Sequence, residues 1–146
     1  MIRIDLDNEL LRPFPIGLFE DVRTTTVVGQ YNELYDVDLR RCYHAQPFDT
    51  SLIITDKRNG FYGDYFRLCM SDEVLNDPNW LKIKNQEGDY WLEEFAVDYM
   101  YEHGIGRIRP LQNYQYGFDY PSLDFFVKNG LTNGLYLKHS HIEGVQ

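Results

Sequence analysis

The stretch LIITDKRNGFYGDYFRLCM, residues 52–70, decides the fold that the sequence predicts. It opens with three apolar residues, 52–54, which favour a short buried strand. The polar run that follows ends in Asn59-Gly60, a pair that favours a tight turn because both residues tolerate positive φ. The aromatic-rich residues 61–70 then predict the returning strand. Residues 52–70 are therefore expected to form a β-hairpin.

Three other segments have the pattern of strands. Residues 22–28 are rich in Thr and Val and end at Gly29, and residues 34–43 alternate between apolar and acidic side chains. Residues 134–140 alternate Leu with Tyr and Lys, and they predict a last strand. Together with the hairpin, these segments predict a largely antiparallel sheet.

Two main helices are expected in the second half of the chain. Residues 89–103 place Leu92, Phe95, Ala96 and Tyr99 on one face at the helical period, and Gly104 is suited to the position just after the helix. The second helix is expected at residues 122–129, which lie between a proline and a glycine.

Shorter elements are expected between the hairpin and the first main helix. Ser71 favours the start of a helix of one or two turns that Pro78 would end. Residues 80–84 are expected to form a strand, and residues 104–120 a long loop or an irregular strand. With 146 residues, the chain is expected to fold as a single compact α+β domain, residues 1–146.

The charge of the chain restricts its partners. There are 23 acidic and 14 basic side chains, which give a net charge of −9. Such a chain repels nucleic-acid backbones and anionic membranes, whose binding depends on Lys and Arg. Direct binding of nucleic acid and of membranes is therefore not expected. The sequence has no apolar run of 18 residues and begins with charged positions, so a cytoplasmic location is expected.

An acidic stripe is the first candidate site. Glu94, Asp98 and Glu102 are spaced at i, i+4 and i+8 on the helix expected at residues 89–103, so their side chains stack on one side. Like charges at that spacing destabilise a helix by about 0.2–0.5 kcal/mol per pair. Either Arg107 and Arg109 fold back to neutralise the stripe, or the stripe contacts a basic partner. Both readings stay open on the sequence alone.

An aromatic segment is the second candidate site. Tyr114, Tyr116, Phe118 and Tyr120 occur within seven residues that also contain a glycine. Tyr-rich loops provide large contact areas at a low entropic cost, so this segment is a candidate partner-binding loop. The alternative is that its rings cover the sheet edge or fill the core.

The residues that carry most enzymatic chemistry form no recognised motif. His139 and His141 would point the same way on a strand, and a metal would need a third ligand, for example from His44 or His103. Cys42 and His44 could be written as a nucleophile and its base, although a buried cysteine is the ordinary reading. No catalytic residue, metal ligand or cofactor is therefore assigned.

These observations favour a non-enzymatic acidic protein that inhibits or modulates a partner with a basic surface. A nucleic-acid-handling protein is one such partner, because the acidic stripe would mimic phosphates. Acidic, motif-free chains of this size are frequent among virus-encoded inhibitors of host defence, and such a protein would act in the host cytoplasm. A small enzyme or ligand-binding protein with a His-based site is the alternative. An assembly subunit is the third, and the oligomeric state stays open.

Overall fold

The computed structural model describes residues 1–5, 8–30, 48–111, 115–117 and 137–139. The strands are β1 (Ile2–Ile4), β2 (Asn8–Leu10), β3 (Thr26–Gln30), β4 (Phe48–Ile54), β5 (Ile108–Leu111), β6 (Gln115–Gly117) and β7 (Leu137–His139). The α-helices are α2 (Phe61–Cys69), α3 (Asp72–Leu75), α4 (Pro78–Glu87) and α5 (Leu92–Glu102). The 3-10 helices are η1 (Ile16–Phe19), η2 (Lys57–Asn59) and η3 (Gly88–Trp91).

The strands form a larger and a smaller sheet. The larger has the order β1-β4-β3-β5, in which β4 pairs antiparallel with both neighbours and β3 pairs parallel with β5. The smaller has the order β2-β7-β6. The predicted α+β fold with a largely antiparallel sheet is thus confirmed.

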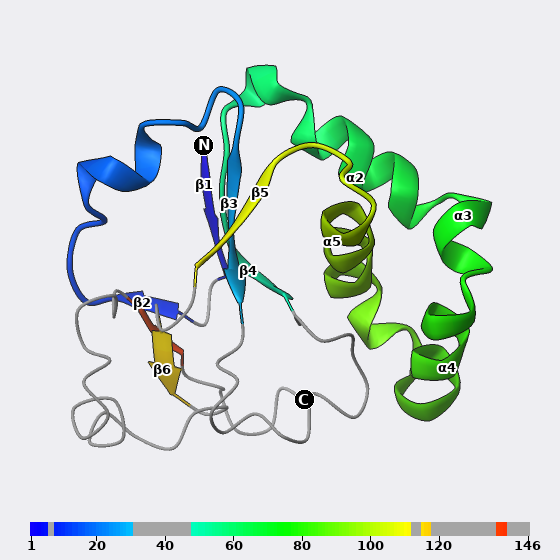
Figure 1. Ribbon diagram of the computed structural model, residues 1–146. Coiled ribbons are helices and arrows are strands. Elements are labelled where there is room, and N and C mark those ends of the chain that lie inside the picture. The colour runs from blue at the N-terminus through cyan, green and yellow to red at the C-terminus, as the bar shows by residue number, and fades with distance from the viewer. Residues whose placement is uncertain (6–7, 31–47, 112–114, 118–136, 140–146) are drawn as a thin grey trace.

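The larger sheet is buried on both faces. Phe48 and Ile53 of β4 pack on one face with the side chains of α2, α4 and α5. Leu52 and Ile54 pack on the other face against apolar residues from positions 14–22. Figure 1 shows the helices on one side of this sheet and the η1 segment on the other. Because β4 is covered on both faces, its seven residues are all buried.

The β-hairpin predicted at residues 52–70 is wrong beyond its turn, because its second half is not a strand. Gly60 has a φ of 79°, so the turn is present, but Phe61 begins the helix α2 in place of a returning strand. Phe61, Tyr65 and Leu68 are spaced at i, i+4 and i+7, and all three are buried. That spacing indicates a helix. Phe and Tyr favour strands, so their abundance at residues 61–70 led to the prediction of a strand despite the helical spacing.

The strand predicted at residues 80–84 is also wrong, because these residues lie within α4. Pro78 begins this helix and does not end the preceding one, since proline is well tolerated in the first helical turn. The Asp77 carboxylate accepts a hydrogen bond from the Asn79 backbone N–H at 2.8 Å, which caps the helix. Trp80 and Ile83 lie on its buried side.

The remaining predictions have mixed outcomes. The helix predicted at residues 89–103 is confirmed as η3 followed by α5, and Gly104 has the expected positive φ of 66°. The short helix after Ser71 is confirmed as α3. The strands predicted at residues 22–28 and 134–140 are confirmed in part, as β3 and β7. Residues 104–120 contain β5 and β6, whereas residues 34–43 and 122–129 lie outside the described residues.

Within the described residues, no helix has the length and apolar character needed to cross a lipid bilayer.

Candidate functional site

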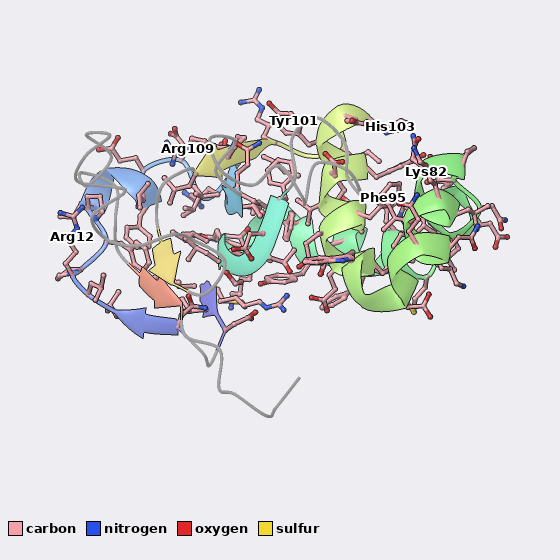
Figure 2. The ribbon with its side chains drawn as sticks, turned by 90° about the horizontal axis from the view of Figure 1, so that it is seen from below. Arg12, Lys82, Phe95, Tyr101, His103 and Arg109 are labelled. Atoms are coloured by element: carbon pink, nitrogen blue, oxygen red, sulfur yellow. The ribbon has the colours of Figure 1, made fainter. Side chains whose placement is uncertain are left out.

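The three acids of the predicted stripe do not share one exposed face. Asp98 is only 1% exposed, and Glu94 is partly buried, while Glu102 at the end of α5 is exposed. The reason is that α5 contributes more than one side to the core, where Phe95, Val97 and Met100 are fully buried. Figure 2 shows Phe95 on the side of α5 that faces α4, where its ring lies 5.6 Å from that of Trp80. The stripe is therefore not a continuous surface feature.

Glu94 belongs to a buried polar cluster between α5 and β4. Its Oε1 accepts a hydrogen bond of 2.9 Å from the Thr50 hydroxyl. Burial, together with the nearby Asp49 and Glu93 carboxylates, raises the pKa of Glu94 to about 7. This carboxyl group therefore gains its proton close to neutral pH, well above the pH at which a solvated glutamate does so.

Asp98, one helical turn further along α5, has the same character. Burial is the main cause that raises the pKa of Asp98 to about 8, and the Glu102 carboxylate adds to the effect. Two successive turns of α5 thus carry carboxyl groups that take up protons at a much higher pH than solvated acids do.

A β-bulge supplies the other half of the cluster. Val28 of β3 pairs with Ile53, but the next residue, Gly29, pairs with Asp49, so residues 50–52 of β4 bulge out of this ladder. The Asp49 carboxylate accepts the Ser51 backbone N–H at 3.0 Å. Bulges redirect side chains, and this one turns Thr50 toward α5.

Arg3 and Cys69 border the cluster. The Arg3 guanidinium donates to Glu93 Oε2 at 3.1 Å, which ties β1 to α5. Burial raises the pKa of the Cys69 thiol to about 11, and Glu93 and Glu94 add to this. The thiol therefore stays protonated at neutral pH and is a poor nucleophile. No group of three metal-ligating side chains is found in the part of the chain that the structure describes.

The two arginines that could neutralise the acidic stripe do not pair with it among the described residues. Arg109 on β5 donates to the Leu18 carbonyl at 3.3 Å, and Figure 2 shows it apart from α5. Arg107 is exposed and lines a small recess with Thr24 and Asp64. Burial of the acids on α5 is thus balanced by protonation and hydrogen bonds and not by these arginines.

Most of the other predicted site residues lie outside the described part of the chain. Tyr114, Phe118 and Tyr120 are not described, and of Tyr116 only its place in β6 is given. Cys42, His44 and His141 also lie outside, and His139 ends β7. His103 stacks on Tyr99 with ring centroids 3.9 Å apart, so its ring packs against the last turns of α5.

The surface of α2 carries a feature that the sequence interpretation missed. Tyr62 and Phe66 on α2 and Met70, which caps its C-terminal end, are spaced at i, i+4 and i+8 and are named here the α2 row. Phe66 is 56% exposed and Met70 is 76% exposed. The Tyr62 and Phe66 rings stack with centroids 5.6 Å apart. The spacing was visible in the sequence, but the expectation of a strand at residues 61–70 concealed it.

An apolar groove adjoins the α2 row at the start of the helix. It has a volume of about 420 Å³. Its lining residues are Met1, Asp56, Lys57, Gly60, Phe61, Tyr62, Gly63 and Phe66. Figure 1 shows the start of α2 and the N-terminus of the chain at the same end of the larger sheet. The row and the groove thus lie next to each other and share Tyr62 and Phe66.

Comparison with known proteins gives no match to this chain among family models, curated proteins or solved structures. Its function is therefore inferred from its own residues.

Proposed function

We propose that this protein is a non-enzymatic binding protein that inhibits or modulates a basic partner protein, and that it contacts this partner through the α2 row. The exposure of Phe66 on α2 and of Met70 at its C-terminal cap carries the proposal. A soluble chain rarely leaves large apolar side chains aligned on its surface unless they contact something. Aromatic and Met side chains are also enriched where proteins bind one another.

The net charge of the chain favours a basic partner over a second copy of this chain. Beside the α2 row the charges are mixed, because the exposed Glu73 pairs with Arg67 at 3.7 Å. Burial raises the pKa of Tyr62, which Arg3 lowers and Glu93 raises. With a net charge of −9, two copies of the chain repel each other, whereas a partner rich in Lys and Arg is attracted. A nucleic-acid-handling protein has a surface of this kind.

The proposal changes the predicted role of the acids on α5. Asp98 is buried and Glu94 is hydrogen-bonded to Thr50, so neither presents a free carboxylate to a partner. Glu102 is exposed at the end of α5. Tyr114, Tyr116, Phe118 and Tyr120 remain proposed contacts.

Substitution of Phe66 by Asp tests the proposal. A partner captured from a lysate of the source organism is purified, and its affinity is measured by calorimetry at low and high salt. We expect F66D to weaken binding at least about tenfold, because a central aromatic anchor is lost. We also expect the affinity of the unsubstituted protein to fall as salt rises, because part of the attraction is electrostatic.

Ile16→Asp is the matched control, because Ile16 is 82% exposed and lies on η1, across the larger sheet from α2. I16D should bind as well as the unsubstituted protein. If F66D and I16D bind the partner equally well, the α2 row is not part of the interface. A dimer that F66D dissociates in sedimentation experiments would instead support the assembly alternative and overturn the proposal.

A further inference from the structure

The groove at the start of α2 has the size and lining of a small-ligand site. Its volume of about 420 Å³ lies within the range of about 300–1,000 Å³ that is typical of such sites. Phe61, Tyr62 and Phe66 supply apolar walls. Small-ligand sites are usually apolar with a few polar groups that orient the ligand, and here the polar groups stand at one end.

Gly63 is the residue that keeps the groove open. Glycine destabilises the interior of a helix, so its presence in α2 needs a reason. Gly63 is not among the described glycines with positive φ, and a Cβ added to it would meet no atom within 4 Å. Neither backbone conformation nor close packing therefore requires glycine there. What its missing side chain provides is open space in the groove.

A cation stands at the polar end of the groove. An adjoining recess of about 340 Å³ is lined by Met1, Asp56, Lys57 and Arg58. Asp56 is engaged by Arg58 through two hydrogen bonds, Nε to Oδ1 at 2.8 Å and Nη2 to Oδ2 at 2.6 Å. Within the described part of the chain, Lys57 forms no ion pair. Besides Arg58, Lys57 is thus one of two cations at this end, and the other is the Met1 α-ammonium, which donates a hydrogen bond to the Thr55 carbonyl at 2.8 Å.

We propose that this groove binds a small apolar carboxylate. The hydrocarbon part lies along Gly63 between the aromatic walls, and the carboxylate lies beside the Lys57 ammonium. The net charge of −9 does not prevent this, because at physiological salt charges are screened beyond about 8 Å and the nearest charge decides. The inference does not depend on the proposed protein partner, although a ligand here would compete with contacts to Phe66.

The test compares octanoate with the neutral 1-octanol by calorimetry on the full chain. Backbone amide NMR shifts of Gly60 and Gly63 report the place of binding. We expect octanoate to bind more tightly than octanol and to shift both amides. Lys57→Gln should weaken octanoate binding about two- to fivefold and leave octanol binding unchanged, since an exposed ion pair contributes little. Lys82→Gln, at an exposed position on α4 labelled in Figure 2, should change neither.

Gly63→Leu provides the second variant, because an added Cβ meets no atom within 4 Å and the rest of the side chain would occupy the groove. We expect G63L to lose octanoate binding at least tenfold while its thermal unfolding midpoint stays the same or rises, since leucine favours the helix. Gly17→Leu on η1, where an added Cβ also has open space, is the matched control and should bind normally. Absence of binding by both compounds would overturn the inference. Equal affinities for octanoate and octanol that K57Q does not change would overturn the assignment of a carboxylate ligand.

Discussion

The unfolding free energy of Asn59→Ala is expected to be lower than that of the unsubstituted protein by about 2–4 kcal/mol, because buried groups are left without partners. The Asn59 amide donates to the Val22 carbonyl at 2.9 Å and to the Thr55 hydroxyl at 2.7 Å. Its Oδ1 accepts the Phe61 backbone N–H at 2.9 Å, which satisfies a donor in the first turn of α2. The side chain thus joins the turn before β3, the residue after β4 and the start of α2. Urea denaturation at pH 6 measures the effect.

Asn85→Ala is the control for this prediction, because Asn85 is exposed on α4. Its change in stability is expected to stay within about 0.5 kcal/mol, as for most surface substitutions. A loss below about 1 kcal/mol in N59A would show that water replaces these hydrogen bonds. The junction between the turn and α2 would then depend on the apolar contacts of Phe61 alone.

The protein is expected to be more stable near pH 5 than near pH 8, on account of Glu94. The pKa of Glu94 is raised from 4.5 to about 7 in the folded protein. Between these values the folded state binds more protons than the unfolded state, so the unfolding free energy falls as pH rises. A raised carboxyl pKa of this size corresponds to a loss on the order of 3 kcal/mol by pH 8. Asp98, with its pKa raised to about 8, acts in the same direction.

Burial outweighs the hydrogen bonds that favour the charged form of Glu94, so the groups around it give this sign on balance. Asp49 on β4 and Glu93 on α5 raise its pKa by repulsion, and Thr50 opposes them with one hydrogen bond. Arg3 is engaged by Glu93. Below about pH 4 stability falls again, because the unfolded state then binds a proton at Asp56, whereas Arg58 holds the pKa of Asp56 in the folded state below its usual range. A stability maximum near pH 5 is therefore expected.

Glu94→Gln isolates the contribution of Glu94. The glutamine stays neutral and keeps an oxygen for the Thr50 hydroxyl, so E94Q is expected to be more stable than the unsubstituted protein at pH 8 and to vary less with pH. Glu20→Gln, at an exposed position just after η1, should leave the pH profile unchanged. Chemical denaturation between pH 4.5 and 8.5 gives these profiles. A stability that increases from pH 5 to pH 8, or an E94Q variant less stable at pH 8, would contradict the prediction.

The proposed protein interface and the inferred ligand site depend on different residues in and next to α2. The protein interface needs the exposed Phe66 and Met70, whereas the ligand site needs the open space at Gly63 and the charge of Lys57. F66D is therefore expected to affect both, while K57Q and G63L report mainly on the ligand. Neither function draws on the protons of Glu94 and Asp98, whose role is to set the pH at which the fold is most stable.

Local chemistry determined several features from the sequence. The Asn59-Gly60 turn, the helix that ends before Gly104 and the apolar strand residues 52–54 follow from backbone preferences and short apolar patterns. The mixture of helices with a largely antiparallel sheet was predicted from the same signals. These features depend on a few neighbouring residues, so a single sequence is enough to indicate them.

Tertiary packing decided what the local signals left open. Residues 61–70 contain residues that favour strands, and they form a helix because Phe61, Tyr65 and Leu68 can then all reach the core. Likewise, the spacing of Glu94, Asp98 and Glu102 showed that they share a side of α5, but not which way that side faces. The rotation of a helix about its axis is set by the elements that pack around it. Here β4 and its bulge lie against that side, so the predicted acidic surface became a buried proton-binding cluster, and the exposed row lies on α2 instead.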